Sequence, residues 1–254
     1  NNQNLTENLI KYLEKKRVNI PVVYSSTIKI NETSDYGRSK KKCEEYLIKS
    51  FKKNKNSLAI LRLPNLFGKW SKPDYNSVVA TFSYHISRNS KVKSNNKKIN
   101  LYYIDDLVKL LFRKFVLNYS KFHSKKKQII ISKFKPIKSI KVNQIESKII
   151  DFENSRKNLL LPNIKSQFDK KLYSTYLTYL PTKKFTYNLN QHLDKRGIFC
   201  EVFKHKNFGQ ISFLTINPHQ IRGEHFHNTK VEKFLLISGK CKFKFNDQNS
   251  SKKI

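Results

Sequence analysis

The sequence predicts an α/β domain built around a parallel sheet, followed by a smaller all-β domain. In the first half, segments with helical spacing of apolar residues alternate with short apolar runs that are typical of buried strands. From residue 187 onward, short strand-like segments lie close together and are separated by turn signals such as Asn217-Pro218 and Ser238-Gly239. We therefore expect domains over 1–155 and 187–254, joined by a linker over 156–186.

The first domain is expected to alternate helices with strands. Cys43, Leu47 and Phe51 recur at helical spacing and predict one buried face on the second helix. Asp105 is expected to cap the fourth helix. The expected helices cover 5–13, 36–53, 77–88 and 107–117, and the expected strands cover 20–24, 58–63, 101–104 and 128–132.

The second domain is expected to contain only strands. These cover 198–203, 210–216, 233–237 and 241–245. Before them, residues 159–187 contain Pro162, Pro181 and several tyrosines, so we interpret this stretch as a connecting segment.

The composition excludes several classes of protein. Hydrophobic residues make up 38% and aromatic residues 13%, which is too much for a disordered polycation. No apolar run approaches the ~18–20 residues of a membrane span, and residues 1–7 lack a signal-peptide pattern. The cysteines (Cys43, Cys200 and Cys241) are odd in number and far apart, which favours a reducing compartment, so we expect a cytoplasmic protein.

The net charge of +34 would attract a polyanion such as nucleic acid. The basic residues are spread along the chain, however, with no Arg-rich arm, zinc-finger spacing or RNA-binding signature. We therefore interpret the charge as compositional drift and do not expect a nucleic-acid partner. The chain also contains no Met, even at position 1, so we expect a fragment or a processed product.

A candidate acid–base site lies at the start of the second expected helix. Tyr36 and Lys40 are four residues apart and share one helix face. A nearby ammonium favours the phenolate, so Lys40 is expected to lower the pKa of Tyr36 from its ordinary value of about 10. Ser25-Ser26-Thr27 ends the preceding strand, at the sheet edge where ligands bind, and a hydroxyl there could hydrogen-bond a reacting carbonyl. The alternative is an exposed pair on a Lys-rich helix.

The stretch from Pro21 to about Glu153 resembles the extended short-chain dehydrogenase/reductases, the NAD-dependent epimerase/dehydratase family. The resemblance implies a Rossmann-like fold and assigns Thr27 the Ser/Thr role, Tyr36 the proton donor and Lys40 the Tyr activator and ribose anchor. Ser25 and Ser26 are alternatives for the role of Thr27. Ser25, Tyr36 and Lys40 are the implied cofactor-binding residues.

A second segment carries the same resemblance. Arg62-Leu63-Pro64-Asn65-Leu66-Phe67-Gly68 is similar to the family's R-x-x-N-x-[FY]-G segment, which implies that Arg62 and Asn65 line a sugar-nucleotide site. The family's Gly-rich phosphate-binding turn has no counterpart among the six glycines. We therefore expect the sequence to begin midway through the dinucleotide-binding domain, with the residues that distinguish NADPH from NADH upstream.

A candidate metal site lies in the second domain. His225 and His227 are two residues apart on an expected strand, so their imidazoles point to one side, and Glu232 is expected to begin the next strand. Two imidazoles and a carboxylate suit Zn²⁺ or a similar divalent ion. The alternative is structural or exposed histidines.

This string resembles the first motif of the cupins, which implies that His225, His227 and Glu232 are three of four metal ligands. The fourth, a His, is expected beyond Ile254. Residues 192–201 also resemble the D-x-R-G-x-F-x-E stretch of sugar-nucleotide epimerase cupins. Arg222-Gly223-Glu224-His225 is similar to their R-G-x-H, in which the His is a base. We favour the ligand role for His225 and a substrate-binding role for Arg222.

The pairing of the two domains resembles the bifunctional capsular polysaccharide enzymes of the CapF type, over nearly the whole chain. Residues 63–70, 72–78 and 172–181 carry this narrower resemblance. It implies C3 epimerisation of a UDP-4-keto-6-deoxy-N-acetylhexosamine by the metal-binding cupin half. It also implies NADPH-dependent reduction at C4 by the first domain, on the path to UDP-N-acetyl-L-fucosamine. The implied partners are a UDP-activated amino-deoxysugar and a second copy of the chain.

Two other hypotheses compete with this enzyme. In the first hypothesis, the chain is an inactive relative or a scaffold, because it lacks both the Gly-rich turn and the cupin segment that would carry the fourth metal ligand. In the second, the charge drives binding to nucleic acid.

Overall fold

The computed structural model describes residues 2–17, 20–53, 56–118, 122, 128–205 and 207–245. The chain divides into two compact units, which are treated separately below: residues 1–190 with 200–213, and residues 191–199 with 214–254. Among the described residues, no helix combines the length and the apolar character needed to cross a bilayer.

The larger unit begins with a parallel sheet in the order β1-β2-β5. Its helices and strands up to β5 are α1 (Asn2–Lys15), β1 (Val22–Thr27), α2 (Asp35–Lys53), β2 (Leu58–Leu63), β3 (Asn65–Phe67), α3 (Val78–Ile86), β4 (Lys98–Tyr103), α4 (Ile104–Leu111), the π-helix η1 (Phe112–Val116) and β5 (Ile129–Lys133). The expected alternation of helices and strands is thus confirmed.

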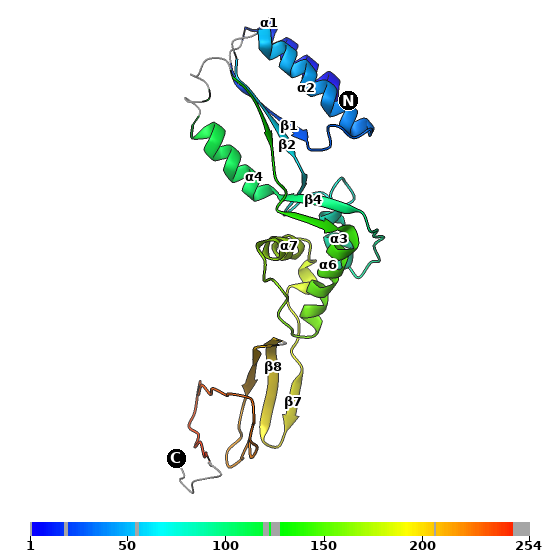
Figure 1. The fold of residues 1–254 in the computed structure, drawn as a ribbon. Helices are drawn as coiled ribbons and strands as arrows, with labels where there is room; N and C mark the ends of the chain where they lie inside the picture. The colour runs from blue at the N-terminus through cyan, green and yellow to red at the C-terminus, as the bar shows by residue number, and fades with distance from the viewer. Residues whose placement is uncertain are drawn as a thin grey trace. The chain divides into compact units, whose positions relative to one another are not determined.

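Helices cover both faces of this sheet because β2 is apolar on both sides. Leu58 and Ile60 pack with α1 and α2, whereas Ala59, Leu61 and Leu63 pack with α4 and η1. Figure 1 shows α1 and α2 on one side of these strands and α4 on the other. A continuous apolar run is what a strand buried on two faces requires.

A second, mixed sheet follows, which the sequence did not predict. β3 pairs in parallel with β4, and β4 pairs antiparallel with β6 (Lys138–Lys141). The sheet packs on α3, α6 (Val142–Lys157) and α7 (Gln167–Leu177) through one apolar cluster. Asp105 was expected to cap α4, and this is wrong. Tyr103 is the N-cap without a side-chain hydrogen bond, and Asp105 lies in the first turn, where its charge favours the helix dipole.

The stretch 159–187 is not only a connecting segment, because it contains α7. Phe168, Leu172 and Tyr176 recur at helical spacing and are buried against α3 and α6. Ser166 caps the helix, since its hydroxyl accepts a hydrogen bond of 3.0 Å from the backbone N–H of Asp169. The prolines and tyrosines mark its flanks and its buried face, and the domain boundaries 1–155 and 187–254 stay predictions.

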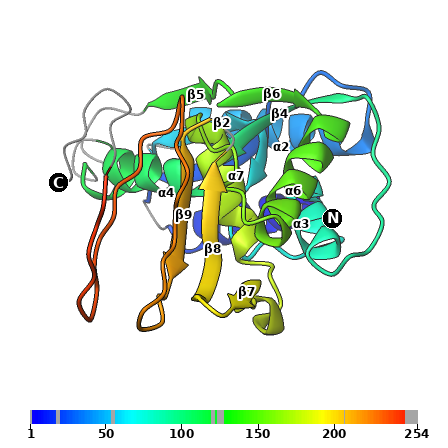
Figure 2. The same cartoon turned by 90° about the horizontal axis from the view of Figure 1, so that it is seen from below.

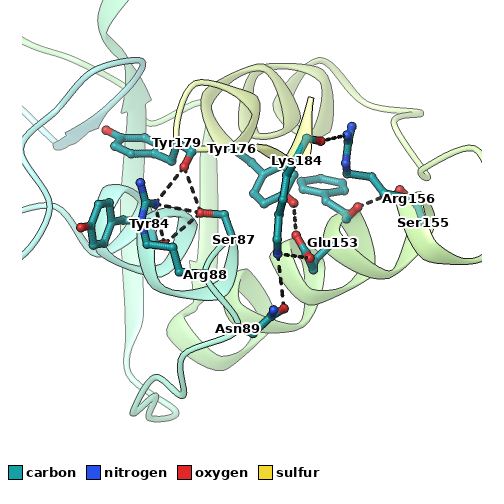
Figure 3. Close-up of polar contacts among 11 residues, drawn as sticks. Tyr84, Ser87, Arg88, Asn89, Glu153, Ser155, Arg156, Tyr176, Tyr179 and Lys184 are labelled. Carbon is teal, nitrogen blue, oxygen red and sulfur yellow. Dashed lines mark hydrogen bonds and ion pairs between the residues drawn. The ribbon is translucent and has the colours of Figure 1, made fainter. Parts of the chain in front are cut away.

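Polar contacts hold the end of α7 and the short 3-10 helix η2 (Thr182–Lys184) against α3 and α6 (Figure 3). The Tyr176 hydroxyl donates to Glu153 at 2.5 Å, and the Lys184 ammonium lies 2.7 Å from the other oxygen of the same buried carboxylate. The Ser87 hydroxyl and Arg88 guanidinium both donate to the Tyr179 carbonyl, at 3.0 and 2.9 Å. Because the buried Glu153 carboxylate needs both partners, these hydrogen bonds favour one arrangement of α7 and η2 against α6.

The C-terminal strands are β7 (Gln191–Asp194), β8 (Gly197–His205) and β9 (Gly209–Leu214), in the order β7-β8-β9. Figure 2 shows β8 and β9 side by side. Gly197 has φ +126°, and a Cβ there would lie 2.5 Å from the Thr215 carbonyl oxygen, so only glycine fits. The strands expected at 198–203 and 210–216 are confirmed.

The strands expected at 233–237 and 241–245 are not found, and the described residues between 215 and 245 include no helix or strand. Their apolar side chains are exposed, with Val231 at 92% and Leu235 at 86%. A residue with strand propensity forms a strand only with a paired neighbour and a buried face, and the described part of this segment is exposed.

Candidate functional site

The carboxyl edge of the parallel sheet positions the candidate acid–base residues. Thr27 ends β1 opposite Leu63 of β2, and the next backbone N–H, of Ile28, donates to the Leu63 carbonyl at 3.0 Å. A short turn then leads into α2, where the Ser34 hydroxyl accepts from the N–H of Gly37 at 3.2 Å. A Cβ on Gly37 would lie 2.7 Å from a turn carbonyl, so glycine lets the turn pack against the helix start beside Tyr36.

Lys40 connects this helix to β1. Its ammonium donates to the Ser25 carbonyl at 2.9 Å and lies 4.8 Å from the ring centroid of Tyr24. The same nitrogen lies 5.9 Å from the ring centroid of Tyr36, which is 50% exposed. Lys40 therefore lies near both Ser25 and Tyr36, and the roles of the three residues stay predictions. Tyr24, which sequence reasoning missed, precedes the serine run directly.

The pKa values at this site differ from the expectation. Burial raises the pKa of Tyr36 above its ordinary value, and burial lowers the pKa of Lys40. The lowering of the Tyr36 pKa that was expected from Lys40 is thus not found, and burial is the cause of the shift. Tyr36 therefore stays protonated at neutral pH and can donate a proton.

The three hydroxyls that end β1 differ in their surroundings. Thr27 is buried, and its hydroxyl oxygen accepts from the Lys29 N–H at 3.1 Å. Ser26 is also buried, and its hydroxyl oxygen has no hydrogen-bond partner among the described residues. Ser25 is exposed. The assignment of the Ser/Thr role to Thr27 stays a prediction. Ser26 stays an alternative, because its hydroxyl could hydrogen-bond a ligand.

Arg62 lies in β2 opposite Ser26, next to the carboxyl end of the strand, and Asn65 follows that end. Arg62 forms a two-pronged ion pair with Glu44 of α2, with nitrogen–oxygen distances of 2.6 and 3.2 Å. Hydrogen bonding to this buried carboxylate raises the pKa of Arg62. Arg62 therefore joins β2 to α2, which favours a structural role over the predicted substrate contact. Asn65 begins β3 and is half-buried opposite Leu101.

The candidate metal ligands lie in the smaller unit. Ligand atoms of His225, His227 and Glu232 all lie within 4.8 Å of one another, and the three residues are exposed. The His227 Nε2 atom is 3.1 Å from a Glu232 oxygen. Although the expected strands are missing, the three groups converge. Two imidazole nitrogens and a carboxylate oxygen suit a divalent ion such as Zn²⁺.

The surroundings of the triad include a lysine and several phenylalanines. A shallow pocket beside His227 and Glu232 is lined by Lys230, Phe234, Phe243 and Phe245. Arg222, predicted to bind substrate, instead pairs with Asp194 at 3.3 Å in this structure. Its side chain is only 13% exposed, so it is held near the start of the motif.

Comparison with known proteins shows what the two parts of the chain are similar to. Residues 1–123 match the NAD dependent epimerase/dehydratase family, and residues 192–254 match the polysaccharide biosynthesis C-terminal domain. The capsular polysaccharide assembling protein CapF from Staphylococcus aureus shares 32% identity with a TM-score of 0.74, over 88% of this chain and 60% of that one. The chain is thus similar to CapF over most of its own length.

Two other relatives extend the comparison. UDP-2-acetamido-2,6-beta-L-arabino-hexul-4-ose reductase from Pseudomonas aeruginosa is 38% identical over 97% of this chain, which spans 65% of the relative's length. UDP-glucose 4-epimerase from Thermotoga maritima has a TM-score of 0.52 at 16% identity, over 68% of this chain and 67% of that one, and shows the fold alone. The chain thus spans less than two thirds of the length of both this reductase and CapF.

Proposed function

We propose that the protein reduces the C4 ketone of a UDP-4-keto-6-deoxy-N-acetylhexosamine and that its C-terminal half supports epimerisation at C3. The product then enters the UDP-N-acetyl-L-fucosamine route of surface polysaccharide synthesis. The observation that carries the proposal is the Tyr36–Lys40 pair at the carboxyl edge of the sheet. The 38% identical relative supports it, since that protein's name is that of a hexul-4-ose reductase.

The residues present fit the groups that this chemistry needs. The hydroxyl of Tyr36 and the ammonium of Lys40 offer donors to a ribose and to a carbonyl oxygen, and the His225–His227–Glu232 donor set suits a divalent ion. When bound, NADPH supplies the hydride for C4 and the metal ion supplies Lewis acidity.

Tyr36 completes the reduction by supplying the proton. Hydride addition at C4 would turn the carbonyl oxygen into an alkoxide, and the Tyr36 hydroxyl, whose pKa burial raises above its ordinary value, would donate its proton to that oxygen to give the alcohol. Lys40 then lies close enough to stabilise the phenolate that remains. Its hydrogen bond to the Ser25 carbonyl holds the ammonium in place for this task.

The metal-binding residues are proposed to serve the epimerisation. A C3 proton is acidic only when the adjacent 4-keto group can become an enolate. His225, His227 and Glu232 would hold the ion at an exposed position that a sugar could reach. The partly buried guanidinium of Arg222 would orient the substrate if it exchanged Asp194 for the diphosphate. We also expect the protein to act as a homodimer.

The purified protein tests this proposal when it is given the 4-keto UDP-sugar and NADPH. We expect substrate-dependent loss of NADPH absorbance and, in deuterated water, incorporation of deuterium at C3. NADH in place of NADPH measures the cofactor preference. If neither NADPH oxidation nor deuterium incorporation depends on substrate, the chain is an inactive relative and the proposed function is wrong.

A further inference from the structure

Lys40 differs from the two lysines that follow it on α2. Lys41 and Lys42 are exposed, as expected on a Lys-rich helix surface, whereas Lys40 is half-buried. Burial lowers the pKa of Lys40, because an ammonium that is partly withdrawn from water loses hydration. Contacts with neighbouring groups must offset this cost if the side chain is to stay inward.

Two groups of β1 supply these contacts. The Lys40 ammonium donates to the Ser25 carbonyl at 2.9 Å, and it lies 4.8 Å from the ring centroid of Tyr24. No carboxylate pairs with Lys40 in the part of the chain that the structure describes. The negative face of the Tyr24 ring is therefore the second group that attracts this ammonium, beside the carbonyl.

The Tyr24 ring is itself held in place by the fold. Tyr24 pairs with Ile60 in the parallel sheet, and its side chain packs against the apolar cluster that includes Leu47 and Ile60. Burial and the nearby Cys43 thiol raise the pKa of the Tyr24 phenol, so the ring is neutral at physiological pH. An ammonium over a neutral aromatic face forms a cation–π contact, which is stronger where water is partly excluded.

This contact bears on the distance between Lys40 and Tyr36. The Lys40 nitrogen lies 5.9 Å from the ring centroid of Tyr36, which is itself 50% exposed. A lysine side chain has several rotatable bonds and loses entropy when it is fixed. Without the Tyr24 ring, we expect the ammonium to spend more time in positions further from Tyr36.

From these observations we propose that Tyr24 is a positioning residue, whose ring face holds the Lys40 ammonium beside Tyr36. The inference rests on the proposed function, because it concerns the same acid–base site. Tyr24 acts through Lys40, which is then placed to contact the ribose of the cofactor and to stabilise the Tyr36 phenolate. This role requires an aromatic face at position 24 and does not require the hydroxyl, which distinguishes it from packing alone.

Competitive acetylation of the full chain, read by mass spectrometry, tests the placement of Lys40 without cofactor or substrate. The labelling rate of each lysine across a pH series gives its pKa. The titratable groups that face Lys40 are Tyr36 and Cys43 of α2 and Tyr24 of β1. Tyr24→Leu keeps an apolar side chain but removes the ring face that favours the ammonium. We expect the Lys40 pKa to fall by about half a unit to one unit, so that labelling at about pH 8 becomes about three- to tenfold faster.

Two further variants separate the ring face from packing. Tyr24→Phe keeps the ring, so we expect the Lys40 pKa of the unmodified chain. A phenylalanine with three ring fluorines at position 24 keeps the shape but withdraws electron density from the face, so the Lys40 pKa should fall as in Tyr24→Leu. This comparison decides the matter even if Tyr24→Leu does not fold. Equal Lys40 pKa values with and without the fluorines would overturn the proposal.

The matched control is Tyr46→Leu, which makes the same change in the same apolar cluster. Within the described residues, the rings that lie over Lys40 are those of Tyr24 and Tyr36, so Tyr46→Leu should leave the labelling of Lys40 unchanged. Lys148, whose ammonium lies 2.8 Å from Asp169, is the internal reference for an intact fold. An equal rise in Lys40 labelling in Tyr46→Leu and Tyr24→Leu would overturn the proposal.

The NADPH assay links the placement of Lys40 to the reaction. We expect kcat/KM for NADPH to fall about tenfold in Tyr24→Leu, because a displaced ammonium contacts the ribose less often, and to be restored in Tyr24→Phe. If Tyr24→Phe is as slow as Tyr24→Leu, the positioning role is wrong while the proposed function stands. If the unmodified chain does not oxidise NADPH, the proposed function is wrong, and the labelling result still decides whether Tyr24 holds Lys40.

Discussion

The two candidate sites of this protein are positioned in opposite ways. Tyr36 and Lys40 stand on a helix whose inner face is buried, with Leu47 1% exposed, against strands that come from distant parts of the chain. His225 and His227 stand in a segment without regular structure, where Val231 is 92% exposed. Tertiary packing therefore places the first site, and short chain spacing places the second.

This difference predicts how each site responds to change. Side chains fixed by a core keep their geometry without a ligand, whereas exposed ligands a few residues apart gain order mainly when a metal binds. Perturbing the core should disturb the acid–base site, and perturbing the metal ligands should leave the core intact.

The largest expected effect comes from Tyr36→Phe. Removing the hydroxyl removes the proton donor while leaving a half-exposed ring in place, so we expect kcat for NADPH oxidation to fall by about 10²–10⁴. Zn²⁺ affinity, measured by calorimetry, should not change. Reduction within tenfold of the unmodified rate would show that another group donates the proton.

Leu172→Ala tests whether α7 belongs to the core. Leu172 is fully buried, so a cavity should cost about 2–5 kcal/mol of the free energy of unfolding in urea. The matched control, Val231→Ala in the exposed segment, should change it by less than about 0.5 kcal/mol. Equal effects of the two variants would contradict the contrast between the regions.

His227→Ala tests the metal site without touching the core. Because one of three converging ligands is lost, Zn²⁺ affinity should fall at least about tenfold in calorimetric titration. The control His192→Ala removes an exposed imidazole that is not part of the triad, and its affinity should be unchanged. If the unmodified chain, His227→Ala and His192→Ala all bind Zn²⁺ with equal affinity, the ion binds at another place.

The smallest expected effect is the pH dependence contributed by Asp169. Burial opposes its ionisation, but hydrogen bonds from Lys148 and Ser166 outweigh burial, so the pKa of Asp169 is lowered. Its stabilising contribution is then present above about pH 4, the unfolded value, and is lost as pH falls through the folded value. Asp169→Asn should lower the free energy of unfolding by about 1 kcal/mol at pH 7, a modest value because Lys148 is partly exposed. The variant should also lose less stability than the unmodified chain as the pH falls below about 4. Urea unfolding at several pH values measures this, and an equal loss of stability at acid pH in both proteins would contradict the prediction.

Local spacing in the sequence determined the features that depend on neighbouring residues. The strand β2 and the shared helix face of Tyr36 and Lys40 could be predicted, because an apolar run and the helix period depend only on neighbouring residues. The convergence of His225, His227 and Glu232 was expected from strands, which the described residues of that segment do not form. The helix α7 was missed although its apolar spacing was visible, since its prolines and tyrosines favoured a loop.

Only the tertiary structure decided what depends on distant partners. Arg62 is paired with Glu44, 18 residues away, and is therefore not a free cation at the sheet edge. Burial, which no local pattern measures, raised the pKa of Tyr36 against the expected effect of Lys40. The strands expected after residue 232 did not form because a strand needs a paired edge and a covered face. Solvent exposure and long-range pairing are properties of the folded chain, so the sequence alone could not supply them.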